Sequence, residues 1–393
     1  MDSIEINQEN TSLDPNKQIK ARQYARISRR LMLVELSWNG LYAFFWLFTG
    51  WSSELRNWLL DLRQNNWLVV AGFILIYAAG DSLVSLPLSY YSGFVLPHKF
   101  EQSNQILKEW IKDHLKGMAI SLPLGLFMIE IIYLILRIFP ENWWLIAAGI
   151  MFVFNILLAN LYPTLIAPLF NKYIPLGEEH ADLEKRLLKL AHEANTHIKG
   201  VYKFDMSRQS KAANAGLTGI GNSRRIVLAD TMISEFSADE IETVLAHELA
   251  HHIHRDFLSG IFISTGFTIL GFYIANLGLN WGIQIFSFKN AADIAALPFL
   301  TILMGVFGIL TMLPGNAFSR WRERKADQYA LEKTQNPEAF ISAMTRLANQ
   351  NLAEIEPERW VELLLHSHPA LGRRIKMAEE FIEAHSAGKW KKT

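Results

Sequence analysis

Three residues in one short stretch of the chain have the types and the spacing of a catalytic metal site. His247 and His251 are four positions apart, so on a helix they lie one turn apart on the same face. Two neutral imidazoles at that spacing can bind one Zn²⁺, and Glu248 beside the first can act as a general base toward the attacking water. The motif predicts a metallopeptidase; a solvated histidine-rich surface or a regulatory metal site are the alternatives.

The sequence also marks where the helix that carries this motif begins. Ser237 and Glu240 form an S-x-x-E capping box, so we expect the helix to start there and to run through both histidines. His252 and His254 follow the motif. His254 could approach the face of His251, three residues before it, but we expect both additional histidines to lie outside the ligand set.

The third metal ligand must come from elsewhere in the chain. The sixth residue after the motif is Phe257, so the third histidine of metzincins is absent. Glu323 would complete a His₂Glu site with an open fourth position, and Asp327, one turn later, could hold a ligating imidazole in the correct tautomer. The alternative is an ordinary charged helix in which both carboxylates pair with neighbouring cations: Arg320, Arg324 and Lys325.

Composition places the chain in a membrane. Hydrophobic residues make up 50% of the 393 residues and charged residues only 19%, which fits membrane spans joined to a hydrated domain. The formal net charge of +0 shows no excess of basic residues of the kind that nucleic-acid-binding proteins have. The absence of cysteine excludes disulfides, thiolate metal sites and cysteine nucleophiles. The polar N-terminus has no signal-peptide core before residue 31.

About six apolar stretches are long enough to cross the hydrocarbon layer, near 31–51, 67–90, 117–139, 143–170, 257–279 and 296–316. We therefore predict a mainly α-helical, multi-pass transmembrane bundle that encloses a chamber and is capped by a small α/β zinc metallopeptidase domain. The expected organisation is a basic arm (1–30), four spans (31–171), the α/β insert with the zinc helix (172–256), two spans (257–316) and a C-terminal helical region with the third ligand (317–393).

Basic residues orient the spans, because lysine and arginine favour the cytosolic side. They precede the first span and lie between the second and the third: Lys17, Lys20, Arg22, Arg26, Arg29, Arg30, Lys99, Lys108, Lys112 and Lys116. The loops at 52–66, 140–142 and 280–295 are poor in them. Both termini, the insert and the tail are therefore expected in the cytosol, where the zinc helix and Glu323 would meet at one membrane face.

The spans also contain polar groups that hydrocarbon does not tolerate without partners: Glu35, Asp81, Glu130, Asn155 and Asn160. They are expected to face a water-filled cavity or to pair with one another as contacts between helices.

The insert has the pattern of a small α/β unit. Residues 183–195 are amphipathic, and 201–204 are strand-like. Residues 212–219, a turn at Gly221 and Asn222, and 224–229 predict a β-hairpin. A strand edge beside the zinc could bind any peptide backbone as an added strand, although a hairpin that only packs on the zinc helix is the alternative.

Taken together, these landmarks resemble the type I CAAX prenyl endopeptidases, which are integral-membrane gluzincin zinc proteases. The matching segments are 166–176 (IAPLFNKYIPL), 213–215 (ANA), 225–230 (RIVLAD), 247–251 (HELAH), the pair Glu323 and Asp327, and His368-Pro369 with Arg374-Ile375. The resemblance implies a water-filled intramembrane chamber below the zinc domain. It also implies that Asn214 and His368 hold the substrate backbone and the oxyanion. Arg374 could anchor the loop of His368 or bind a substrate carboxylate.

The expected activity is zinc-dependent endoproteolysis near the C-terminus of prenylated CAAX-type or other membrane-associated proteins. Zn²⁺ is held by His247, His251 and Glu323, Glu248 is the base, and His368 and Asn214 act on the substrate. The eukaryotic members have one more N-terminal span, and nothing in these residues reads a prenyl chain. A quality-control protease without prenyl specificity and a non-hydrolytic carrier with structural zinc are the alternatives. The expected location is a bacterial inner membrane, or an ER-type membrane in a eukaryote, with peptide or protein substrates and the bilayer as partners.

Overall fold

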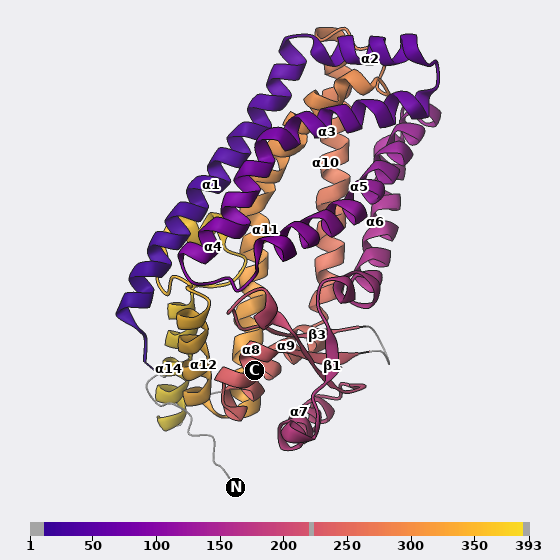
Figure 1. Ribbon diagram of the computed structural model, residues 1–393. Helices are drawn as coiled ribbons and strands as arrows, with labels where there is room; N and C mark the ends of the chain where they lie inside the picture. Colours follow the sequence, from indigo (N-terminus) through magenta and orange to yellow (C-terminus); the bar gives the residue numbers. More distant parts are fainter. Residues whose placement is uncertain (1–11, 220–223, 388–393) are drawn as a thin grey trace.

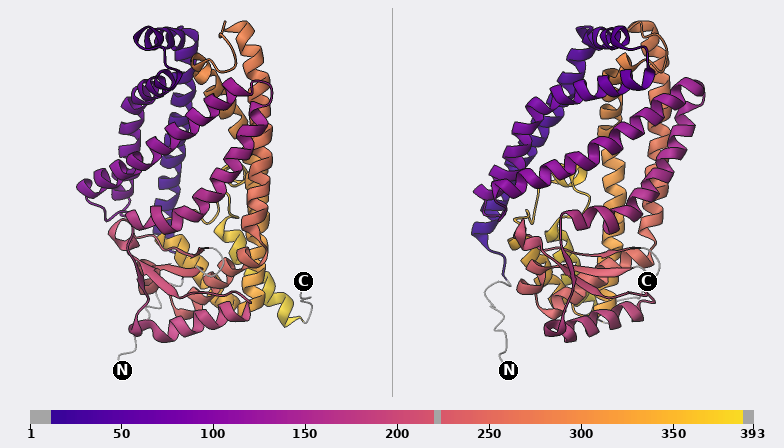
Figure 2. Two further views of the ribbon diagram at one scale, coloured as in Figure 1. Left: turned by 90° about the vertical axis from the view of Figure 1, so that its right-hand side faces the viewer. Right: turned by 45° about the vertical axis from the view of Figure 1, so that its right-hand side comes forward.

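The computed structural model describes residues 12–219 and 224–387 and shows a long helical bundle with a small α/β unit at one end (Figure 1). The views in Figure 2 show the same two parts from other sides. The helices are α1 (Pro15–Phe48), α2 (Trp51–Leu62), α3 (Asn66–Tyr90), α4 (Leu96–Lys99), α5 (Leu107–Ile138), α6 (Trp143–Leu161), α7 (Ala181–Glu193), α8 (Asp230–Glu235), α9 (Ala238–Ile253), α10 (Asp256–Ile285), α11 (Leu297–Thr334), α12 (Pro337–Gln350), α13 (Arg359–Leu365) and α14 (Leu371–Ser386). The strands are β1 (Tyr173–Pro175), β2 (Val201–Phe204), β3 (Ala215–Thr218) and β4 (Arg225–Ala229).

Among the described residues, six helical segments are long and apolar enough to cross a membrane, which confirms the expected number. They are Pro15–Phe48, Asn66–Lys99, Leu107–Ile138, Trp143–Leu169, Asp256–Ile285 and Ile294–Thr334. The first helix begins sixteen residues before the apolar stretch at 31, because the Asp14 side chain caps it and Pro15 occupies its first turn. Residues 15–30 of the expected basic arm are therefore helix.

The end of the bundle opposite the α/β unit is held by an apolar core and one buried ion pair. Phe73, Tyr133 and Trp143 are almost fully buried there. The Arg56 guanidinium on α2 pairs with the Asp293 carboxylate just before α11. Both groups are nearly inaccessible to solvent, so this pair fixes how α2 meets the start of α11.

The polar residues within the spans differ in their surroundings. Asp81 accepts hydrogen bonds from Trp38 Nε1 at 2.9 Å and from Ser85 Oγ at 3.3 Å, so it links α3 to α1 in the manner expected of a contact between helices. Asn160 donates to a carbonyl of its own helix. Glu130 is buried, and its Oε2 has no hydrogen-bond partner within the described chain. Glu35 is exposed.

The α/β unit is built on a four-stranded mixed sheet with the order β1-β2-β4-β3. β2 pairs with β4 in parallel, and β3 pairs with β4 antiparallel, with Ala215 opposite Leu228 and Thr218 opposite Arg225. The predicted hairpin is confirmed by this second pairing, whereas its turn at Gly221 and Asn222 lies outside the described residues. β3 is an edge strand, and it contacts the helix α9.

The sheet and the helices around it share a second apolar core. Side chains of β4, α9, α12 and α14 are buried together, among them Ile226, Leu228, Leu249 and Phe340. The 38-residue helix α11 continues past the bundle into this unit and contacts α9 there (Figure 1). One helix therefore carries both a candidate membrane span and Glu323, the predicted third metal ligand.

Candidate metal centre and active site

The helix that carries the histidine pair begins where the sequence predicts. The Ser237 hydroxyl accepts from the Glu240 backbone N–H at 3.2 Å, and the Glu240 carboxylate accepts from the Ser237 N–H at 2.7 Å. The other carboxylate oxygen of Glu240 accepts from Ser342 and from Arg346 Nε on α12. Because Glu240 is only 2% exposed, this network fixes the start of α9 against α12.

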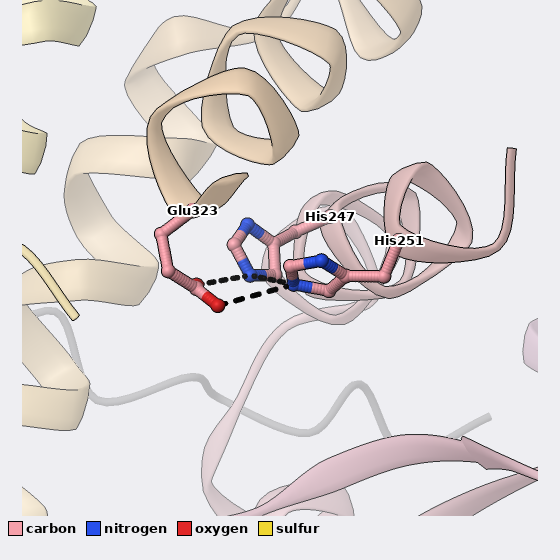
Figure 3. Close-up of side chains that lie close together, drawn as sticks. All are labelled: His247, His251 and Glu323. Carbon is pink, nitrogen blue, oxygen red and sulfur yellow. Dashed lines mark hydrogen bonds and ion pairs between the residues drawn. The ribbon is translucent and has the colours of Figure 1, made fainter. Parts of the chain in front are cut away.

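His247, His251 and Glu323 converge on one point (Figure 3). The two Nε2 atoms are 3.2 Å apart, and they lie 3.2 Å and 3.4 Å from the two carboxylate oxygens of Glu323. Ligand atoms about 2.1 Å from one tetrahedral zinc would be roughly 3.4 Å apart, so the three groups fit such an ion. Glu323 Oε2 is also buried, and it faces Nε2 of His247 and Nε2 of His368 rather than solvent. A shared cation accounts for the facing nitrogen lone pairs and for this oxygen.

The other nitrogen of His247 is held by a buried acid. Its Nδ1 lies 2.9 Å from Asp327 Oδ1, and Asp327 is fully buried. Arg374 Nε donates to the second oxygen of Asp327 at 2.9 Å, and Arg374 is itself buried. Burial alone would lower the pKa of His247, but its bonds to Asp327 and Glu323 outweigh that effect and raise the pKa to about 9.

His251 has a corresponding partner that the sequence did not reveal. Its Nδ1 lies 2.7 Å from Asp256 Oδ2, on the first residue of α10. Arg255 adopts a left-handed conformation with φ of 55° between α9 and α10, and this sharp corner brings Asp256 back beside the histidine. Arg322 Nη1 donates to the Asp256 carbonyl at 2.9 Å. Both imidazoles therefore have the carboxylate support that is typical of zinc ligands.

The predicted catalytic side chains lie around this cluster. His368 Nε2 is 3.4 Å from Glu323 Oε2, and its side chain is 60% exposed, so it can reach both the metal position and a substrate. Glu248 is half-buried and lines a cleft beside His251. Burial raises the pKa of Glu248, against the opposing effect of the two histidines. Asn214 is exposed and directly precedes β3.

The loop that carries His368 is tied to the helix of Glu323. Arg320, one turn before that ligand, donates from Nη1 to the carbonyls of Glu362 at 2.9 Å and His366 at 2.6 Å. The Glu362 carboxylate in turn accepts from the Ala370 N–H at 3.1 Å. Arg320 is buried and its Nη1 binds these two carbonyls, rather than Glu323 or Asp327 as in the alternative of a charged helix. Arg320 therefore fixes the position of the His368 loop relative to Glu323.

Three further predictions concern residues beside the site. His254 ends α9 with its ring near Tyr329, and it is absent from the ligand cluster, as expected. His252 lines the cleft of Glu248, where burial and the nearby Arg224 lower its pKa. Arg374, predicted with Asp327 to support the metal ligands without binding the metal, pairs with Asp327 in the interior, behind His247. Its suggested contact with the loop of His368 or with a substrate carboxylate stays a prediction.

Two clefts flank the metal cluster. The first, which we call the lateral cleft, has a volume of about 530 Å³ and is lined by the ends of β3, α6 and α10 and by Glu248 and His251. The second, which we call the α1 cleft, has a volume of about 720 Å³ and is lined by α1, by Asn351 and by the loop of His368. Residues of the site border both clefts, since Glu248 and His251 line the first, and His368 and Arg374 line the second.

Comparison with known proteins agrees with this geometry. The model described as "Peptidase family M48" matches residues 178–382, and the model described as "CAAX prenyl protease N-terminal, five membrane helices" matches residues 8–172. The chain belongs to peptidase family M48. Among M48 relatives, it is 30% identical to the "Uncharacterized metalloprotease YhfN" of Bacillus subtilis, over 94% of this chain and 87% of that protein. It is also 30% identical to "CAAX prenyl protease 1" of Saccharomyces cerevisiae, over 82% of this chain and 75% of that protein.

The M48 fold extends over the whole molecule. The crystal structure of S. mikatae Ste24p superimposes with a TM-score of 0.84, covering 96% of this chain and 92% of that one at 24% sequence identity. The chain is therefore a multi-pass membrane zinc metalloprotease whose zinc site consists of His247, His251 and Glu323. The predicted fold class, enzyme class and metal are confirmed.

Proposed function

We propose that this M48 protease cleaves extended segments near the C-terminus of membrane-associated proteins, with prenylated CAAX-type proteins as one such class. The observation that supports it most is the position of the metal cluster: the helix α9 that carries both histidines contacts the edge strand β3, and His251 lines a cleft formed where α6 ends and α10 begins. Apolar side chains line that cleft at Tyr162, Phe257 and Leu258. A peptide tethered to the bilayer would reach the site there, and the CAAX prenyl proteases among the relatives are consistent with such a substrate.

The chain's own groups divide the reaction between them. Zinc, when bound, would polarise the attacking water and the scissile carbonyl. Glu248 would take the proton of that water and deliver it to the leaving amine, a role that suits a carboxylate with a raised pKa. His368 would donate a hydrogen bond to the oxyanion. Its Nδ1 lies 2.9 Å from the Ser367 hydroxyl, and its Nε2 lies 3.4 Å from Glu323, so Nε2 is the ring nitrogen placed to donate to the oxyanion.

The edge strand would hold the substrate backbone. Asn351 Nδ2 and Oδ1 bind the Ala213 carbonyl at 3.3 Å and N–H at 2.8 Å, which fixes the chain just before Asn214. The Asn214 carbonyl accepts from the Ala229 N–H at 2.9 Å. The Asn214 carbonyl is thus bonded to β4, whereas its side chain is exposed. That side chain could hydrogen-bond a peptide that adds to β3 and so align it.

We place the active site on the cytosolic face of the membrane. The start of α1 and the end of α14 lie at the same end of the molecule as the α/β unit (Figure 2). The basic residues of α1 and of the α3–α5 connection are at this end, and such residues favour the cytosol. In a bacterium this is the inner membrane; in a eukaryote it is an ER-type membrane.

A peptide comparison tests this proposal. Purified protein in detergent is given a prenylated C-a-a-X peptide, its unprenylated twin and an unrelated membrane-protein segment, each with and without a metal chelator. Chelator-sensitive cleavage of the prenylated peptide alone supports CAAX processing. Equal cleavage of all three supports a quality-control protease without prenyl specificity. No chelator-sensitive cleavage of any of them contradicts the proposal, and a carrier with structural zinc would then remain.

A further inference from the structure

The lateral cleft contains two arginine side chains that no part of the catalytic account uses. Arg224 directly precedes β4, and Arg255 occupies the corner between α9 and α10. Both line the cleft together with Glu248 and His251. Neither guanidinium pairs with a carboxylate in the part of the chain that the structure describes. Two arginines from separate elements therefore line the same cleft as Glu248 and His251.

The neighbouring Arg225 has the same charge as Arg224 but lies outside the lateral cleft. Its guanidinium carbon lies 5.6 Å from the ring centre of Tyr202, and it is not among the residues that line the cleft. Arg224 and Arg225 are adjacent in the sequence, yet only Arg224 reaches the cleft. Arg255 reaches it from an exposed position, and its backbone has a left-handed conformation that residues other than glycine rarely adopt.

If a substrate peptide pairs with β3, the direction of β3 determines which part of the peptide lies in the lateral cleft. The chain before β3 is held by Asn351, which lines the α1 cleft, and Leu217, Thr218 and Gly219 at the other end of the strand line the lateral cleft. Antiparallel pairing is the more stable way to add a strand, and it is how β3 already pairs with β4. A peptide added in that direction has its N-terminal part in the lateral cleft and its C-terminal part toward the α1 cleft and His368.

The lining of the lateral cleft then defines the chemistry of that N-terminal part. Tyr162, Phe257 and Leu258 offer an apolar wall, and the two arginines offer charge-assisted hydrogen bonds at its edge. The register that places Thr218 opposite Arg225 puts Arg224 just beyond the end of β3. β3 can pair with about four residues of a substrate peptide. An anionic side chain of the substrate that reaches Arg224 would therefore belong to this paired segment.

We propose that the lateral cleft selects substrates with a carboxylate side chain shortly before the scissile bond, and that Arg224 and Arg255 are the residues that determine this preference. The inference rests on the proposed function, because it assigns a substrate class to the same site. It adds a direction of binding, an apolar residue next to the cut and an acidic residue upstream of it. An anionic lipid headgroup at the membrane surface would be a different ligand for the same arginines.

The test uses synthetic decapeptides with a Phe-Leu pair at the centre, and mass spectrometry identifies the bond that is cut. One pair of peptides carries two Asp or two Lys at the second and third positions before the central bond, and a second pair carries them after it. The zinc-loaded protein in neutral detergent should cleave the upstream-Asp peptide with a kcat/KM at least about tenfold above that of its Lys twin, the value of one charge-assisted bond. Arg224→Glu and Arg255→Glu should each remove or reverse this ratio.

The controls separate this inference from the proposed function. Arg225→Glu makes the same change of charge one residue away and should leave the ratio unchanged, and one zinc per chain shows that each variant is folded. Equal cleavage of the upstream pair, or a preference carried only by the downstream pair, would overturn the inference while the protease activity stands. A ratio that disappears when vesicles of anionic phospholipid replace the detergent would assign the arginines to lipid. No cleavage of any peptide would contradict the proposed function itself.

Discussion

Replacing Asp327 with asparagine should lower both the zinc affinity and the stability of the protein, because this buried carboxylate contacts His247 and Arg374. Asn keeps the size of the side chain, but it removes the charge that faces His247 Nδ1 at 2.9 Å and Arg374 Nε at 2.9 Å. Loss of such support for a zinc-ligating histidine typically weakens metal binding about 10- to 100-fold, or about 1.4 to 2.7 kcal/mol. Independently, the buried Arg374 would lose the carboxylate that it pairs with, and breaking a buried ion pair costs about 3 to 5 kcal/mol of stability.

The zinc measurement has a defined pH dependence. In the metal-free protein the raised pKa of His247, about 9, means that zinc must displace a proton at neutral pH. Asp327 stabilises that proton, so its removal also reduces the competition, and part of the loss is hidden at pH 7. Zinc competition against a chromogenic chelator should therefore show a defect in Asp327→Asn that grows from pH 7 to pH 9.5.

A second variant isolates the contribution of the buried charge. In Asp327→Asn combined with Arg374→Met, the unpaired guanidinium is gone, so the midpoint of thermal unfolding should return most of the way to that of the unchanged protein. Zinc affinity should remain low, because the imidazole of His247 is still unsupported. Unchanged zinc affinity of Asp327→Asn at pH 9.5 would refute the role assigned to this carboxylate, whatever its effect on stability.

Three further results are expected. The pKa of His247 is raised from 6.5 in the unfolded chain to about 9 in the folded protein, so protonated His247 stabilises the metal-free protein fully below about pH 6.5, and this contribution is lost as the pH rises through 9. The midpoint of thermal unfolding of chelator-treated protein should fall over this range, and a midpoint that does not change with pH would contradict the prediction. Glu248→Gln should retain one zinc per chain and lose about 10²- to 10⁴-fold in kcat, whereas full turnover would exclude it as the base. Arg320→Gln should keep zinc and KM but lower kcat, since it frees the loop of His368; a change in KM alone would contradict that role.

The parts of the site that local sequence determines could be predicted, and they are found as expected. The capping box at Ser237 and Glu240 sets the start of α9, and the four-residue spacing then fixes the two imidazoles on one face. Glu323 was inferred because a third ligand was required and because both segments border membrane spans at one face. The structure brings all three together.

The missed residues depend on contacts that no local pattern encodes. Asp256 reaches His251 only because Arg255 turns the chain sharply, and a left-handed arginine has no sequence signature. Arg320 was considered only as a neighbouring cation for Glu323 and Asp327, because the backbone carbonyls that it binds are more than forty residues away in the sequence. The early start of α1 was missed because the search followed apolar runs, although Asp14 is a capping residue. That the spans enclose a water-filled chamber stays a prediction.

X-ray absorption at the zinc edge of the purified protein tests the central claim most directly. The account predicts one zinc per chain, four-coordinate, with two imidazole nitrogens and the remaining ligands oxygen, and loss of this site in Glu323→Ala. A spectrum with a third imidazole, or a Glu323→Ala variant that keeps the metal and its spectrum unchanged, would contradict the His₂Glu site and with it the open position that hydrolysis requires.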